Sequence, residues 1–245
     1  MTRVLVTIHG TGRIEEDFWV SQQAALAQHL GAPPHLHPVW WGDLIDAGAR
    51  LPAVRDRMTA RIHAVAQDWL GRPSRYAHRL VERASDKLHD FVNGTAGVVA
   101  YFVPDQKQVV IRERLSRTLT DLTARGHEIV LVAESLGSVV AFDVLSREAE
   151  RFRLAAWVTV GCPLRLLVRT GQRRADLGAI NTRTVRQWLN LHAPFDPIAA
   201  PVAPAFPGYP VRDERIDGSG GLFEAHANYW ANPRSTALIA GTLHA

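Results

Sequence analysis

The chain has 245 residues, enough for one large α/β domain with a single core, so we expect one domain over residues 1–245. Its one cysteine, Cys162, excludes an intrachain disulfide and a cysteine-rich metal site. The sequence starts without a signal-peptide pattern and has no apolar run of the ~18 residues that a membrane span needs. We therefore expect a cytoplasmic protein, with peripheral membrane contact left open.

The positive charge is modest and comes almost entirely from arginine. The formal net charge is +4, and Lys87 and Lys107 are the only lysines. A composition rich in Ala and Arg and poor in Lys is explained more simply by GC-rich coding than by a surface for nucleic acid. We therefore expect no nucleic-acid partner.

The first predicted element is a short apolar strand over 4–8, which ends at His9-Gly10-Thr11-Gly12. A dinucleotide-binding loop, G-x-G-x-x-G, would need a third glycine where this chain has Glu15. The interpretation as a dinucleotide-binding loop is therefore weak.

A helix over 18–30, ended by Gly31, and a strand over 36–41 are predicted next. His35 and His37 would face one side of the extended segment, but a metal site would need a third ligand nearby. We expect no metal and no organic cofactor.

Residues 46–103 are predicted to form a helical insertion that a minimal α/β domain does not need. The periodicity is helical over 51–69 and 76–92, and an apolar segment follows at 91–103. Two accounts stay open: a helical layer packed on the sheet, or a cap whose apolar inner surface receives an acyl chain. An interfacial membrane helix is a third account, although the segment lacks a flanking basic face.

The central motif of the chain lies at 129–145, after an amphipathic helix over 105–125 that Gly126 ends. The run Ile129 to Val132 predicts a strand, and an apolar helical pattern starts directly after Ser138. The turn between them, Ala133-Glu134-Ser135-Leu136-Gly137-Ser138, has small residues two positions before and after Ser135. Such a strained turn lifts a serine hydroxyl above the carboxyl edge of a sheet, next to a helix N-terminus that favours an oxyanion.

This motif resembles the nucleophile elbow of α/β-hydrolases of the lipase and serine-esterase kind, which often reads AHSLGS. Ala133 replaces the usual first glycine and Glu134 the usual histidine; a carboxylate there would oppose an oxyanion unless it points away or is paired. The resemblance implies an α/β-hydrolase fold with a mostly parallel sheet flanked by helices. It also implies that the oxyanion hole consists of the backbone N–H groups of Thr11 and Leu136, and that His9 is structural.

Two later segments carry the same resemblance. After a strand over 155–160 that ends near the buried Cys162, and another over 185–191, Asp196 lies in an F-D-P-I turn similar to the acid-bearing turn of these esterases. His226 begins an H-x-x-Y-W-x-N segment, which is similar to the segment that carries their catalytic histidine. A terminal helix from about Pro233, capped by Asn232, is predicted next.

Chain order in this fold is serine, acid, histidine. Only Asp196 directly follows a predicted strand, and only His226 lies on a predicted loop between such a strand and the final helix. The competing candidates are less well placed; they are Asp143, Asp176, Asp213, Asp217, His192 and His244. The predicted catalytic triad is therefore Ser135, Asp196 and His226.

The triad predicts a serine hydrolase that cleaves the ester bond of a small molecule or lipid through an acyl-enzyme. The alternatives are an acyl-thioesterase or acyltransferase with the same triad, and a non-catalytic binding protein that keeps the fold. Oligomeric state is left open.

An arginine-rich stretch over 164–186 contains six arginines and one acid, Asp176. A solvated face is the ordinary explanation for such a stretch. The alternative is that Arg173 and Arg174, in a loop on the same edge as Ser135, bind an anionic group of the substrate.

Overall fold

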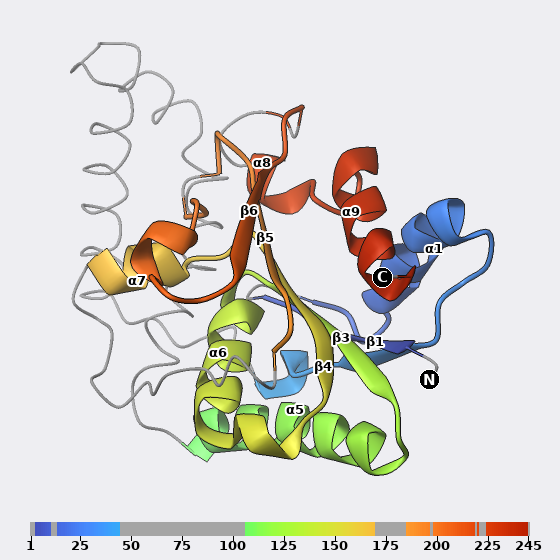
Figure 1. Cartoon of the computed structure of the whole chain (residues 1–245). Helices are drawn as coiled ribbons and strands as arrows, with labels where there is room; N and C mark the ends of the chain where they lie inside the picture. The colour runs from blue at the N-terminus through green and yellow to red at the C-terminus, as the bar shows by residue number, and fades with distance from the viewer. Residues whose placement is uncertain are drawn as a thin grey trace.

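The computed structural model describes residues 3–10, 14–44, 106–169, 185–196, 198–218, 220 and 224–244. These residues form a six-stranded sheet in the order β2-β1-β3-β4-β5-β6, with helices on both sides (Figure 1). Every strand pair is parallel. The predicted fold class, α/β with a parallel sheet flanked by helices, is confirmed. The insertion at 46–103 lies outside the described residues, and the single-domain expectation stays a prediction.

The strands are β1 (Arg3–Ile8), β2 (Leu36–Val39), β3 (Glu128–Glu134), β4 (Leu154–Val160), β5 (Trp188–His192) and β6 (Val211–Arg215). The α-helices are α1 (Trp19–Leu30), α5 (Gln106–Ala124), α6 (Leu136–Glu148), α7 (Leu164–Arg169), α8 (Glu224–Ala227) and α9 (Pro233–His244). Three short 3₁₀ helices are η1 (Gly42–Leu44), η2 (Ala149–Arg151) and η3 (Ala203–Ala205).

The central strands are apolar on both faces because each face is covered by helices. In β3, Ile129, Leu131 and Ala133 belong to the core that α5 and α6 cover. Val130 and Val132 alternate with them and belong to the core that α1 and α9 cover. The continuous apolar run that predicted this strand is therefore the result of two separate cores.

Helices α1 and α9 lie side by side on one face of the sheet, although they come from opposite ends of the sequence (Figure 1). The side chain of Arg3, in β1, donates a hydrogen bond to the carbonyl of Thr242, in α9, at 3.0 Å. Leu26 of α1 and Ile239 of α9 are both fully buried in the same core. One side of β1 is thus covered jointly by α1 and α9.

Most predicted elements are present with small shifts of their ends. Gly31 and Gly126 have left-handed φ values of 74° and 81°, so the predicted helix ends are confirmed. At the start of α9, the side-chain oxygen of Asn232 accepts hydrogen bonds from the N–H groups of Arg234 and Ser235, at 3.0 and 3.3 Å, which confirms the predicted cap.

Two predictions about the C-terminal third need correction. Strand β6 was not predicted, because its sequence VRDER lacks an apolar pattern; it is an edge strand with one side exposed. His226 does not lie on a loop but in the one-turn helix α8. Among the described residues, no helix is both long and apolar enough to cross a membrane.

Candidate active site

Ser135 lies in the turn between β3 and α6, at the carboxyl edge of the sheet. Its φ is 50°, and within the described residues it is the only non-glycine residue with a positive φ. Its N–H donates to the carbonyl of Val160 at 2.8 Å, and its carbonyl accepts from the N–H of Ser138 at 3.0 Å. The elbow is thus held by β4 and by the first turn of α6 in a conformation that costs a non-glycine residue about 1–2 kcal/mol.

Two glycines give the elbow room. A Cβ atom on Gly137 would lie 2.7 Å from the carbonyl oxygens of Ile8 and His9, and one on Gly10 would lie 2.6 Å from Cβ of Ser135. The close approach at Gly137 is therefore to the end of β1. The loop after β1 passes directly against the serine.

His226 bridges Ser135 and Asp196. Its Nε2 lies 3.0 Å from Oγ of Ser135, and its Nδ1 lies 2.8 Å from Oδ2 of Asp196. Because a carboxylate can only accept, Nδ1 carries the proton, and Nε2 is left with a lone pair directed at the serine hydroxyl. Three segments far apart in the sequence thus contribute a hydroxyl, an imidazole and a carboxylate to one continuous chain of hydrogen bonds.

The carboxylate of Asp196 is almost fully buried and accepts four hydrogen bonds. Oδ1 accepts from the N–H groups of Ile198 and Ala199, at 3.0 and 3.1 Å, and Oδ2 accepts from His226 and from the Tyr229 hydroxyl. Burial alone would raise the pKa of Asp196. The charge of His226 and these hydrogen bonds outweigh burial, so the pKa lies below its ordinary value and the group is a carboxylate near neutral pH.

Two opposing effects also act on His226. Burial lowers its pKa. The charge of Asp196, the hydrogen bond to Asp196 and the charge of Glu134 together raise the pKa by more than burial lowers it, so the net shift is upward. The ring packs against Gly161, at the end of β4, whose φ is 63°. A Cβ atom there would lie 3.0 Å from Cε1 of the ring. The position of the His226 ring therefore requires a residue without a side chain at position 161.

Tyr229 supports the acid, a role that we did not predict from the sequence. Its hydroxyl donates to Oδ2 of Asp196 at 2.9 Å and accepts from the N–H of Ala193 at 2.8 Å. The side chain is buried. The H-x-x-Y-W-x-N segment already showed a tyrosine three positions after His226. Only the fold shows which groups its hydroxyl is hydrogen-bonded to.

Glu134, the unusual residue before the serine, is paired. Its Oε2 accepts a hydrogen bond from Nε1 of Trp230 at 3.0 Å. Burial raises the pKa of Glu134, whereas this hydrogen bond and the charge of His226 oppose the shift. A paired carboxylate is one of the two conditions under which a glutamate is tolerated beside an oxyanion.

His9 has the structural role that was expected. Its Nδ1–H donates to the carbonyl of Gly10 at 2.8 Å, and its Nε2 accepts from the N–H of Trp41 at 3.0 Å. Its ring also stacks on Trp41. Burial lowers the pKa of His9 to about 4, so the ring is neutral near pH 7.

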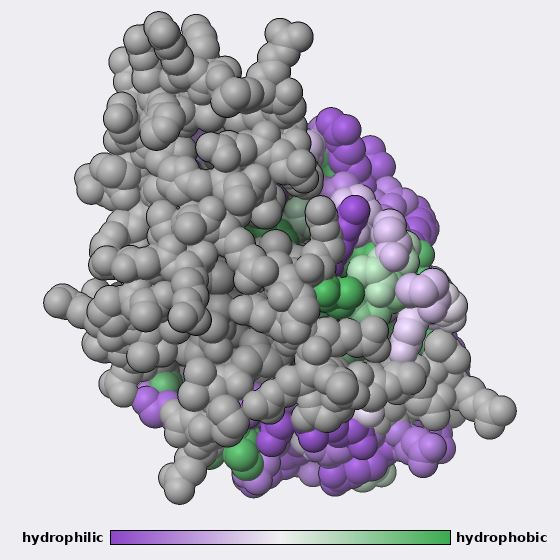
Figure 2. Space-filling view, turned by 90° about the vertical axis from the view of Figure 1, so that its left-hand side faces the viewer, coloured by the Kyte–Doolittle hydropathy of each residue, from purple (hydrophilic) through white to green (hydrophobic). Residues whose placement is uncertain are grey.

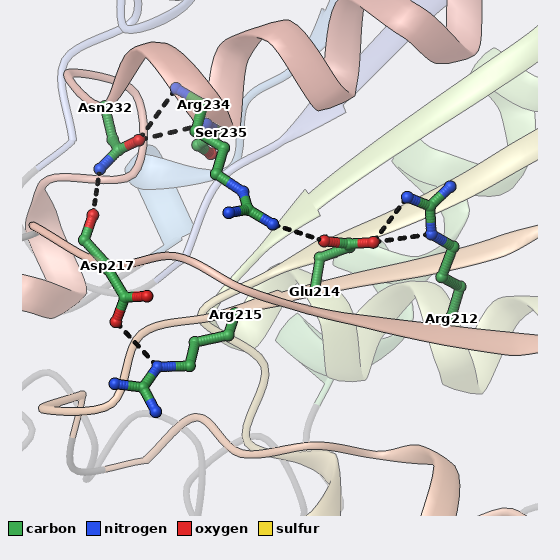
Figure 3. Close-up of polar contacts among 7 residues, drawn as sticks. All are labelled: Arg212, Glu214, Arg215, Asp217, Asn232, Arg234 and Ser235. Carbon is green, nitrogen blue, oxygen red and sulfur yellow. Dashed lines mark hydrogen bonds and ion pairs between the residues drawn. The ribbon is translucent and has the colours of Figure 1, made fainter.

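Polar contacts join the residues on either side of the segment that carries His226 (Figure 3). The side-chain N–H of Asn232 donates to the carbonyl of Asp217 at 2.9 Å. Arg234, in α9, pairs with Glu214 of β6 at 3.0 Å. The first contact joins the two ends of the segment that carries α8, which lie 15 positions apart, and the second joins α9 to β6.

The other candidate acids that the structure describes have different partners. Asp143 pairs with Arg112 and Arg147, between α5 and α6. Asp213 accepts from the N–H groups of Val202 and Ala203, at 2.8 and 3.0 Å. Asp217 pairs with Arg215 at 2.8 Å.

Several predicted site residues cannot be placed. Thr11, Arg173 and Arg174 lie outside the described residues, as does the competing acid Asp176. Leu136 is the first residue of α6, so its N–H has no acceptor within the helix. In the part of the chain that the structure describes, no three His, Cys, Asp or Glu side chains are grouped as metal ligands would be.

Cys162 is buried, as predicted. Burial raises the pKa of its thiol to about 12, which leaves it protonated and a poor nucleophile near neutral pH.

Comparisons with known proteins give little beyond this geometry. The chain matches no protein-family model, and it matches no curated protein. Among solved structures it is similar to a protein of Xanthomonas campestris pv. campestris, described as a candidate hydrolase of the alpha/beta superfamily. The identity is 16%, the match covers 98% of each chain, and the TM-score is 0.45. A match at this level assigns no activity.

Proposed function

We propose that the protein is a serine hydrolase of the α/β-hydrolase type that cleaves carboxylic esters. One observation carries the proposal: Ser135, His226 and Asp196 form a continuous hydrogen-bonded chain, with distances of 3.0 and 2.8 Å, at the carboxyl edge of a parallel sheet. The serine sits in a strained strand-to-helix turn, as the nucleophile of such enzymes does.

The reaction follows from the positions of the groups. Nε2 of His226 takes the proton of the Ser135 hydroxyl as Oγ attacks the ester carbonyl. Asp196 holds the ring in the required tautomer and stabilises the imidazolium. The N–H of Leu136, together with a donor from the loop after β1, stabilises the oxyanion. His226 then protonates the leaving alcohol, and water, activated by the same histidine, releases the acid from Ser135.

An exposed apolar side chain supports an apolar acyl or alcohol group in the substrate. Phe195 directly precedes Asp196 and is 60% exposed. Figure 2 shows one face of the molecule, where the described surface is mostly hydrophilic with a smaller apolar area. Single exposed apolar residues are ordinary on protein surfaces, so Phe195 is a candidate substrate contact only because it directly precedes Asp196 in the sequence.

The pairing of Glu134 also bears on the non-catalytic alternative. A glutamate beside the serine was the main argument for a silent site. Because Trp230 donates to that carboxylate at 3.0 Å, the argument loses most of its force. Thioester hydrolysis and acyl transfer use the same triad and differ only in the group that enters or leaves.

The test is covalent labelling with a fluorophosphonate, which reacts only with an activated serine. We expect the wild type to be labelled, Ser135→Ala to be unlabelled but folded, and Ser146→Ala, a serine elsewhere in the same helix–turn unit, to be labelled like the wild type. Turnover in Ser135→Ala should fall by four or more orders of magnitude (about 10⁴-fold or more). A folded wild type that is neither labelled nor able to hydrolyse any ester would overturn the proposal.

Substrate screening then separates the finer alternatives. Oxygen esters and acyl thioesters of the same chain length, compared by kcat/KM, decide between an esterase and a thioesterase. Neutral and anionic esters, compared in the double variant Arg173→Ala, Arg174→Ala, test whether these arginines bind an anionic group. Equal effects on the two substrates would remove that role.

A further inference from the structure

Glu134 occupies a defined side of the sheet. Side chains alternate along a strand, and Val130 and Val132 both point into the core that α1 and α9 cover. Glu134, the next residue in that series and the last of β3, continues on the same side. It therefore lies on the side where the segment after His226 packs, since Tyr229 belongs to that same core and Trp230 packs against it.

The carboxylate meets this segment through one contact. Nε1 of Trp230 donates to Oε2 of Glu134 at 3.0 Å. Glu134 directly precedes Ser135, and Trp230 follows His226 by four residues. The hydrogen bond thus joins the strand that carries the nucleophile to the segment that carries the base, independently of the contact between Ser135 and His226 themselves.

We propose, on the basis of the function proposed above, that Glu134 is a positioning residue for His226. Anchored by Trp230, it holds the histidine segment against the elbow and supplies a second negative charge, beside that of Asp196, for the imidazolium that forms when His226 takes the serine proton.

The electrostatics agree with this role. The charged groups that raise the pKa of His226 against the effect of burial are Asp196, after β5, and Glu134, at the end of β3. The groups that oppose the effect of burial on the pKa of Glu134 are Trp230 and His226. The two ionisable side chains therefore stabilise each other's charged forms, which is the state reached at the tetrahedral intermediate.

The sign of the pH effect follows. The base must be neutral, so kcat/KM falls as the pH drops through the pKa of His226. Since the charge of Glu134 raises that pKa, removing the charge should move the acidic limb to lower pH. It should also lower the plateau, because the imidazolium loses a stabilising charge.

Glu134→Gln separates charge from hydrogen bonding, because a glutamine keeps an oxygen that accepts from Trp230. We expect this variant to stay folded, to show an acidic limb displaced to lower pH, and to lose several-fold in kcat at the plateau. The matched control is Glu148→Gln, at the end of α6, which should leave the limb where it is. Trp230→Phe, which keeps the charge and removes the donor, should lower kcat with little change in KM.

If Glu134→Gln does not fold, Glu134→His is the second variant, since histidine is common at this position in similar elbows and carries no negative charge. It must also displace the acidic limb of kcat/KM to lower pH. A limb and plateau unchanged from the wild type in a folded variant would overturn the proposal.

A measurement without turnover separates this proposal from the proposed function. NMR can follow the titration of the His226 ring in Ser135→Ala protein and in the double variant Ser135→Ala, Glu134→Gln. We expect the midpoint of this titration to lie at lower pH in the double variant. This result holds even for a protein that hydrolyses no ester, whereas an identical titration in both proteins removes the coupling whatever the activity.

Discussion

The hydroxyl of Tyr229 donates a hydrogen bond to Oδ2 of Asp196 at 2.9 Å, and so shares that oxygen with His226. The same hydroxyl accepts from the N–H of Ala193 at 2.8 Å. Tyr229 therefore ties the acid to the start of its own turn. The orientation of the acid depends on a residue of the histidine segment, so the two segments can only be correctly placed together.

Tyr229→Phe should lower kcat by between about 10- and 100-fold, because Asp196 loses one of four hydrogen bonds and the ring of His226 loses its fixed partner. The free energy of unfolding should fall by about 1–3 kcal/mol, since the buried N–H of Ala193 loses its acceptor. Steady-state kinetics and urea denaturation measure the two effects. Tyr209→Phe, on the opposite face of the sheet, is the control and should leave kcat unchanged; a Tyr229→Phe variant with wild-type kcat would contradict the role.

Gly161→Ala should inactivate the protein through the histidine rather than through the fold. Its Cβ would lie 3.0 Å from the ring of His226, and a displacement of that ring by about 1 Å costs on the order of 10²-fold in turnover. The control is Gly126→Ala, which has a similar left-handed φ of 81° but no atom within 4 Å of the added Cβ. Both should lose roughly 1 kcal/mol of stability from backbone strain. Equal turnover in the two variants would show that Gly161 does not set the place of His226.

Ser135→Gly should be more stable than Ser135→Ala by about 0.5–1 kcal/mol, although both lack the nucleophile. The reason is the φ of 50°, which glycine adopts freely and alanine does not. Chemical denaturation of the two inactive proteins, side by side, measures the difference. Equal stabilities would mean that the turn relaxes when the hydroxyl is removed, and that the strain belongs to the active site rather than to the backbone.

Local sequence was enough to predict the elements that have strong periodicity. The strand–turn–helix at 129–145 and the helix ends at Gly31 and Gly126 were all visible as runs and breaks of apolar residues. Strand β6 was not visible, because an edge strand needs no apolar face to be held by its neighbour. The pairing of β6 with β5 is a property of the sheet, not of the residues VRDER.

The site divides in the same way. Ser135, Asp196 and His226 were selected because their segments resemble those of α/β-hydrolases and because their chain order fits that fold, and the structure brings these three side chains together. The contacts of Gly10, Tyr229 and Gly161 could not be predicted, since each depends on how two distant segments meet. Glu134 lies between these cases: the alternation along β3 already indicates its side of the sheet, but its partner Trp230 is 96 positions away.

The cover of β1 by α9 has a consequence for how the chain folds. Arg3 and Thr242 are 239 positions apart, and Leu5 of β1 shares a core with Ile239 of α9, so this side of β1 is not fully covered until α9 has been made. Contacts at such separation are slow to form, and unfinished chains expose apolar surface in the meantime. His226 lies in the same late segment. A nascent chain therefore carries Ser135 long before it carries His226, the base of the proposed mechanism.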